Sequence, residues 1–209
     1  MKMLYALLII LIAATGYASQ KAITDTGEEI IVYSDGTWKC PNKMKQKLGA
    51  IQVNKNTFNK PNDSSFLLKS TTNKSAFWIN TNKWSFLKTK KETNGKEYEF
   101  QLKGKDLKGM AITEEIEIEL QSLTDLALIN AQKVAPEIKI LKKEYRTVND
   151  KKVIYMKMNG TIQGINVTYF GYYYSDTYGT TQLLAYVSTN LISKYKLEIN
   201  NFLNGLVTQ

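Results

Sequence analysis

The sequence predicts an α+β domain in which an antiparallel sheet is covered by two helices, preceded by a small β-hairpin. Three observations carry this prediction. Runs of alternating apolar and polar residues recur after residue 75, two segments change to the helical period, and the last four predicted strands are joined by very short connections. Connections this short join antiparallel neighbours, and the order strands, helix, strands, helix is typical of α+β folds.

The chain begins with a predicted export signal. Lys2 supplies a positive charge, residues 4–14 form an apolar run, and Gly16 and Ala18 are the small residues that signal peptidase prefers. The run is shorter than the roughly 20 apolar residues that span a bilayer. We therefore expect an exported protein, periplasmic or secreted, without stable membrane insertion after cleavage. A form anchored by residues 1–18 is the alternative.

Two further segments precede the main domain. Residues 19–40 are predicted to form the N-terminal β-hairpin element, because Ile30–Tyr33 favours a strand and glycine-containing turns lie on both sides of it. Residues 41–74 are rich in Lys, Asn, Ser and Thr and are predicted to form a linker with at most a short ordered piece at Phe66–Leu68. The main domain is then expected to cover residues 75–209.

The first half of this domain is predicted to contain four strands. Ala76–Ile79 and Trp84–Leu87 flank an Asn-Thr-Asn turn, and Lys96–Leu102 alternates aromatic or aliphatic residues with polar ones. Met110–Leu120 alternates isoleucine and leucine with glutamate, the pattern of a strand with one wet face. These segments would form one part of the sheet.

The second half begins and ends with a helix. Ser122–Ala135 has apolar residues at helical spacing, with Ser122 or Thr124 as the expected N-cap and Pro136 beyond its end. The closing segment, Asn190–Leu206, carries an apolar stripe that we expect to pack on the sheet. Four strands are predicted between them, at Ile138–Thr147, Lys152–Thr161, Ile165–Ser175 and Gly179–Ser188.

The layout also resembles a known family. The early Trp84 in a W-x-F strand, the strand "TQLLAYVSTN" and the closing helix "YKLEINNFLNGLV" resemble the PsbP-like α/β/α sandwich over about residues 75–209. Many bacterial proteins of that group are exported, and the resemblance brings no catalytic motif. The segment "ITDTGEEIIVYSDGTWKC" resembles a short DGTW-type hairpin element of secreted bacterial proteins, which implies an envelope location.

Composition excludes several classes of function. The chain contains no histidine and a single cysteine, so the common histidine-dependent nucleophiles and metal sites are absent, and we predict no enzyme and no cofactor. The formal charge is +9, but only Arg146 is an arginine, which disfavours nucleic-acid recognition. Cys40 has no partner within the chain and is interpreted as an incidental thiol, with an intermolecular disulfide as the alternative.

Two groups of residues are candidate sites. Alternate carboxylates of a strand lie about 7 Å apart, so Glu115, Glu117 and Glu119 could approach a hard cation such as Ca²⁺. A solvated strand face is the preferred interpretation, because the sequence lacks the pattern of a calcium loop.

Tyrosines of the strand Ile165–Ser175 and its turn form the second candidate. Tyr172, Tyr174 and Tyr178 could offer exposed rings that bind a sugar, a peptide or a protein, but the preferred interpretation is that helices cover most of both faces of this strand and the hydroxyls reach the rim. The sequence thus favours an exported, non-enzymatic binding or accessory protein of the bacterial cell envelope, which contacts a protein or an envelope component. A carrier of a small apolar ligand between helix and sheet, and a carboxylate-based enzyme that acts on glycans, remain the alternatives.

The mature protein is expected to begin at Ser19, because Gly16 and Ala18 are the well-placed small pair after the apolar run. N-terminal sequencing of the exported protein checks this. Recovery of an intact form beginning at Met1 from the membrane fraction would favour the anchored alternative.

Overall fold

A computed structural model describes residues 19–23, 29–34, 38–39, 51–89 and 95–209. The chain divides into two compact units, Met1–Met44 and Lys45–Gln209. The predicted signal and Cys40 lie outside the described residues. Among the residues that are described, no helix is both long enough and apolar enough to cross a membrane.

The N-terminal unit contains a three-stranded antiparallel sheet. Its strands are β1 (Ser19–Ile23), β2 (Glu29–Tyr33) and β3 (Trp38–Lys39), with β2 in the middle. Strands β2 and β3 occupy the predicted hairpin, and β1 adds a third strand that pairs with β2 along its whole length.

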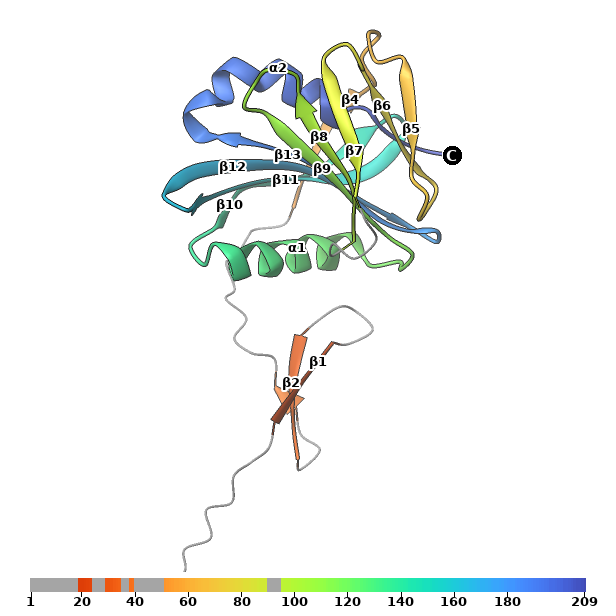
Figure 1. Ribbon diagram of the computed structural model, residues 1–209. Helices are drawn as coiled ribbons and strands as arrows, with labels where there is room; N and C mark the ends of the chain where they lie inside the picture. Colours follow the sequence, from red (N-terminus) through yellow and green to blue (C-terminus); the bar gives the residue numbers. More distant parts are fainter. Residues whose placement is uncertain (1–18, 24–28, 35–37, 40–50, 90–94) are drawn as a thin grey trace, which may run out of the picture. The chain divides into compact units, whose positions relative to one another are not determined.

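An eight-stranded sheet forms the centre of the larger unit (Figure 1). Its strand order is β4-β10-β11-β12-β13-β9-β8-β7, and every neighbouring pair is antiparallel except β4 and β10, which are parallel. The strands are β4 (Gln52–Phe58), β7 (Trp84–Lys88), β8 (Lys96–Leu102), β9 (Lys108–Glu114), β10 (Lys139–Val148), β11 (Lys151–Ile162), β12 (Ile165–Asp176) and β13 (Gly179–Ser188). The four consecutive strands predicted in the second half are confirmed.

A second, three-stranded sheet has the order β14-β6-β5 and contains β5 (Phe66–Lys69), β6 (Ser75–Ile79) and β14 (Leu206–Thr208). The fold is therefore mixed, with a large sheet and a small one, instead of a single antiparallel sheet covered by two helices.

Residues 41–74, predicted as a linker, contribute β4 and β5. Strand β4 lies at the sheet edge with mostly exposed side chains, so its sequence shows no apolar alternation.

Helix α1 (Leu120–Val134) begins two residues before the predicted start, because Glu119 is its N-cap. The Glu119 carboxylate accepts hydrogen bonds from the backbone N–H groups of Gln121 (2.7 Å) and Ser122 (2.9 Å).

A 3-10 turn (Thr189–Leu191) leads into helix α2 (Ile192–Leu203). The closing helix thus ends before Leu206, which was predicted to be helical and lies in β14.

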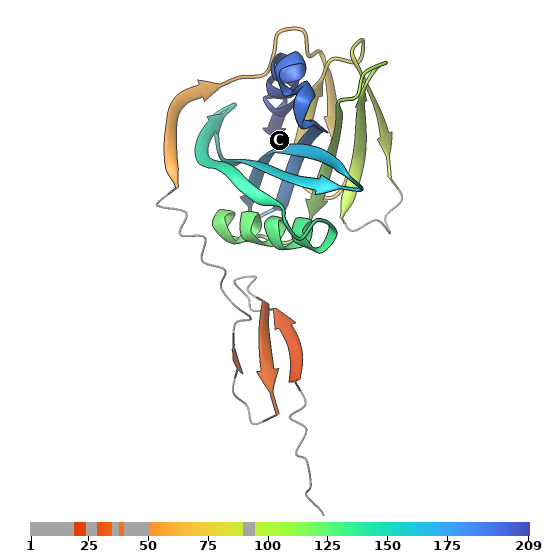
Figure 2. The same cartoon turned by 90° about the vertical axis from the view of Figure 1, so that its left-hand side faces the viewer.

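The helices cover opposite faces of the large sheet (Figures 1 and 2). Helix α2 and the small sheet together bury one face, and α1 packs against β11 and β12 on the other. Strand β12 contributes to both cores: Phe170, Tyr172 and Tyr174 point toward the α2 side, while Tyr169 and Tyr173 point toward α1. The aromatic side chains of β12 thus alternate between the two faces, as the pleat of a strand requires.

The aromatic contacts of Phe202 generate a prediction about stability. Its ring is buried and stacks on Trp84 at 4.5 Å between centroids, and it fills the space left free by Gly109. Phe202→Ala should lower the free energy of unfolding by about 3–5 kcal/mol. Leu197→Ala in the same helix, at a side chain 68% exposed, should change it by no more than about 0.5 kcal/mol. Urea unfolding checks both, and equal midpoints would contradict the docking of α2.

Candidate functional site

A row of side chains crosses the part of the large sheet that α1 leaves open. The row is defined by cross-strand partners in register on five adjacent strands, in the order Tyr169 (β12), Tyr186 (β13), Lys108 (β9), Gln101 (β8) and Ser85 (β7). Side chains of cross-strand partners stand on the same face of a sheet. We call this set the cross-strand row.

An open groove of about 320 Å³ lies along most of this row. It is lined by the row residues Tyr186, Lys108, Gln101 and Ser85, and by Phe86, Leu87, Glu99, Phe100 and Gly109. The lining joins an aromatic ring, a cation, an anion, an amide and a hydroxyl on neighbouring strands, so the groove offers both stacking and hydrogen bonding to a ligand.

Tyr169 and Tyr186 form the aromatic end of the row. Their rings stack with centroids 5.3 Å apart and an angle of 26° between the planes, and both side chains are half-buried. Burial raises the pKa of Tyr186, and the Glu99 carboxylate adds to this effect. Burial, and then Tyr186, raise the pKa of Tyr169. Both phenols therefore stay protonated at neutral pH and can donate hydrogen bonds.

The polar members of the row differ in how firmly they are held. Gln101 Nε2 donates to the backbone oxygens of Leu102 and Leu107, both at 3.2 Å, so its amide is fixed in place. Lys108 is exposed, and among the described residues its ammonium group forms no hydrogen bond or ion pair. Glu99, in the groove wall, is paired with Lys96. The groove therefore presents one cation whose charge a ligand can neutralise.

The candidate tyrosine platform is wrong for two of its three members, for which the preferred interpretation, burial under the helices, is confirmed. Tyr172 and Tyr174 are only 1% and 8% exposed, because the α2 side of β12 is covered, while Tyr178 in the turn is 57% exposed. Tyr178 contacts Lys74, whose Nζ lies 5.6 Å from the ring centroid. A half-buried aromatic pair is formed instead by Tyr169 on the other face of β12 and by Tyr186, a residue that the sequence analysis did not single out.

The predicted acidic strand also needs correction. Strand β9 ends at Glu114, which pairs with Thr180 close to the start of β13, so the chain beyond it has no partner strand there. Glu115 and Glu117 lie in the connection to α1, and Glu119 caps that helix. No metal-binding group of three or more Cys, Asp or Glu side chains forms among the residues that the structure describes.

Arg146 lies between two aromatic rings at the β4 edge of the large sheet. The centroids of the Phe58 and Tyr155 rings are 4.5 Å and 3.7 Å from its guanidinium carbon. Phe58 belongs to β4 and Tyr155 to β11, so the cation on β10 joins three strands. This contact helps to hold β4 on the sheet.

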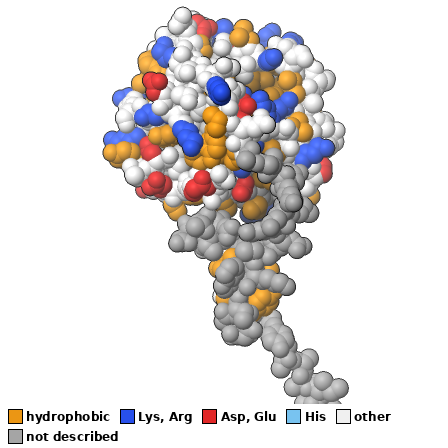
Figure 3. All heavy atoms as spheres, turned by 180° about the vertical axis from the view of Figure 1, so that it is seen from behind, with side chains coloured by type: hydrophobic (Ala, Val, Ile, Leu, Met, Phe, Trp, Pro, Cys, Tyr) orange, Lys and Arg blue, Asp and Glu red, His pale blue; other side chains and the backbone are white. Residues whose placement is uncertain are grey.

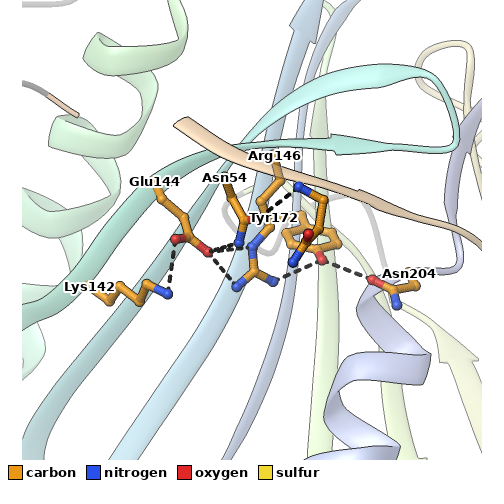
Figure 4. A network of polar contacts seen from close by, with 7 residues as sticks. Asn54, Lys142, Glu144, Arg146, Tyr172 and Asn204 are labelled. Atoms are coloured by element: carbon orange, nitrogen blue, oxygen red, sulfur yellow. Dashed lines mark hydrogen bonds and ion pairs between the residues drawn. The ribbon is translucent and has the colours of Figure 1, made fainter. Parts of the chain in front are cut away.

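A chain of polar contacts continues from the same guanidinium (Figure 4). Arg146 Nε donates to Glu144 at 2.7 Å, and its Nη1 donates to the Tyr172 hydroxyl at 3.2 Å. Glu144 also accepts from Asn54, and it pairs with Lys142 at 2.9 Å. Burial alone would raise the pKa of Glu144, but these donors outweigh it and lower the pKa. The buried ion pair is internally compensated and has a structural role.

Glu97 is a second buried carboxylate. It accepts hydrogen bonds from the hydroxyls of Ser70 (2.7 Å), Thr71 (2.8 Å) and Thr113 (2.7 Å), and from the Thr71 N–H (2.6 Å). Burial raises its pKa, but these bonds outweigh that effect and the net shift is downward. A general acid requires a raised pKa, so neither Glu97 nor Glu144 fits that role.

The space beside α2 is small. The crevice lined by Trp78, Trp84, Glu198 and Phe202 has a volume of about 10 Å³, which is room for a single water. This crevice does not offer the pocket that a carrier of an apolar ligand needs.

Basic side chains are distributed over the surface. On the face shown in Figure 3, Lys and Arg side chains lie among acidic, hydrophobic and uncharged polar ones. On that face the positive charge does not form one continuous patch of the kind that tracks a nucleic-acid backbone.

No family model matches the sequence, and no curated protein matches it. Similarity to solved structures is clear. Cyanobacterial PsbP (CyanoP) from Synechocystis sp. PCC 6803 superimposes with a TM-score of 0.54 at 12% identity, covering 70% of this chain and 94% of that protein. The larger unit has a PsbP-like fold. The resemblance inferred from element order is thus confirmed at the level of the fold, while the resemblance of residues 23–40 to DGTW-type elements stays a prediction.

A second structure similar to this PsbP-like domain is a Pseudomonas aeruginosa protein of unknown function, described as a putative regulator. Its TM-score is 0.44 at 9% identity, with 69% of this chain and 96% of that protein covered. At 12% identity, the likeness to CyanoP shows the fold alone.

The buried Glu97 carboxylate predicts a pH-dependent stability. Its lowered pKa stabilises the fold above the unfolded-state pKa of about 4.3, and this contribution disappears as the pH falls through the folded-state pKa. Glu97→Gln should cost about 1–3 kcal/mol at pH 7, and the difference from wild type should shrink below about pH 4. Urea unfolding at both pH values measures this.

A matched control lies two residues further along β8. Glu99→Gln removes an exposed carboxylate whose ion pair should contribute less than about 1 kcal/mol. Equal urea midpoints for wild type and Glu97→Gln at pH 7 would contradict the role assigned to Glu97.

Proposed function

We propose that this protein is an exported, non-enzymatic binding or accessory protein of the bacterial cell envelope, and that it binds an envelope component at the cross-strand row. The observation that carries the proposal is the open groove of about 320 Å³ on a sheet face whose other half is covered by α1. A groove that combines the Tyr186 ring with polar and charged side chains is typical of a recognition surface.

Three further observations support a binding role over catalysis. The sequence has no histidine. The buried carboxylates Glu97 and Glu144 both have lowered pKa values and are held by structural partners. The largely buried Arg146 guanidinium is neutralised by its ion pair with Glu144. None of these groups is poised for proton transfer at neutral pH.

The predicted signal at residues 1–18 supports the envelope location. A PsbP-like fold is compatible with this location, although the fold by itself does not determine function.

Co-sedimentation with purified envelope fragments of the host tests the proposal. The full mature chain should pellet with the fragments, and Ser85→Tyr should reduce the pelleted fraction several-fold because a bulky ring blocks the groove. Ser193→Tyr is the matched control, since it adds the same ring at an exposed position of α2, which lies on the opposite face of the sheet. Both substitutions are at exposed positions and should leave the melting temperature nearly unchanged.

Two results would overturn the proposal. Wild-type protein that stays in the supernatant would exclude an envelope ligand. Wild type and Ser85→Tyr pelleting equally would exclude the cross-strand row as the binding surface.

A further inference from the structure

The cross-strand row has the length and direction of a site for a chain-like ligand. Its five members lie on adjacent strands, and a strand spacing of about 4.8 Å gives a span of about 19 Å from Tyr169 to Ser85. A ligand that contacts all of them must lie across the strands. A peptide that adds to a sheet runs alongside the edge strand instead, so this direction disfavours strand addition at β7.

The charge of the row selects the ligand. Lys108 lies at its centre, exposed and without a charged partner among the described residues, whereas the nearby Glu99 is already paired with Lys96. An anionic group at the centre of the ligand would form a charge-assisted hydrogen bond with Lys108, which is stronger than a bond between neutral groups. The net charge of +9, summed over the whole chain, also attracts anions to the protein.

The neutral members of the row fit hydroxylated rings. The stacked ring of Tyr186 is held by Tyr169 before any ligand binds, so little side-chain entropy is lost on contact. The Gln101 amide is fixed by its backbone bonds, and its oxygen remains an acceptor for hydroxyl groups. The Ser85 hydroxyl, which donates weakly at 3.3 Å to the Gln101 backbone oxygen, lies at the far end.

We infer that the cross-strand row binds an anionic oligosaccharide, laid across the strands with one sugar ring on Tyr186 and an acidic group at Lys108. The inference rests on the proposed function and names the ligand class of the same site. A sugar ring has an apolar face for the tyrosine and hydroxyl edges for Gln101 and Ser85. A carboxylate or sulfate group on such a sugar provides the negatively charged partner for the Lys108 ammonium group.

Isothermal titration of the full mature chain with acidic hexasaccharides tests the inference. The probes are hexagalacturonate, a hyaluronan hexasaccharide, and the methyl ester of hexagalacturonate, which keeps the shape and removes the charge. We expect at least one acid to bind, with hexagalacturonate binding about tenfold more tightly than its ester. Lys108→Gln should abolish that difference. Lys196→Gln removes an exposed lysine from α2 on the opposite face and should preserve it.

Each remaining outcome decides against the inference. Failure of hexagalacturonate to bind, equal affinities for this acid and its ester, or an unchanged preference in Lys108→Gln would overturn it. Competition by hexaglutamate as effective as that of the acidic sugars would identify an acidic peptide as the ligand class instead. In all these cases, co-sedimentation with envelope fragments that is sensitive to Ser85→Tyr would leave the proposed function standing.

Discussion

The large sheet must bury apolar side chains on both of its faces, but the two faces are covered unequally. Helix α2 and the small sheet cover one face, and α1 alone covers the other. Eight strands spaced about 4.8 Å apart are about 34 Å wide, whereas a helix of 15 residues is about 22 Å long and about 10 Å thick. Whichever way α1 lies, part of its face of the sheet stays open, and the cross-strand row occupies that part.

Because the helices cover the large sheet incompletely, polar groups hold the segments at its edges. Strand β4 is an exposed parallel edge strand with few apolar side chains, and the Arg146 cation between Phe58 and Tyr155 helps to attach it. The segment after β5 is attached by the Glu97 carboxylate through hydroxyls and a backbone N–H. Both charges are buried: Arg146 is paired with the Glu144 carboxylate, and Glu97 is hydrogen-bonded to three hydroxyls and a backbone N–H. They therefore serve the architecture, whereas Lys108 in the groove lining is exposed and forms no ion pair among the described residues.

A binding role follows from this division between compensated and available groups. The charged side chains with shifted pKa values are tied to partners, whereas the Lys108 ammonium group and the side-chain oxygen of Gln101, both from residues that line the groove, remain available to a ligand. Recognition needs such available groups on a rigid support, and sheet strands provide one. The proposed ligand class is a consequence of which groups the register brings together, since Lys108 and Tyr186 are cross-strand partners.

The sequence alone determined the period of the elements, because apolar side chains must repeat every second residue in a strand and at helical spacing in a helix. It therefore predicted the four strands from β10 to β13, both helices and the two-sided burial of β12. It did not predict β4, whose exposed side chains show no alternation, or the end of β9 at Glu114, which depends on where its partner β13 begins. Only the tertiary structure decided which tyrosines are exposed. Because a strand is pleated, Tyr172 and Tyr173 point in opposite directions. The placement of α2 and α1 decides which parts of each sheet face are covered. It leaves Tyr169 and Tyr186 at the open surface.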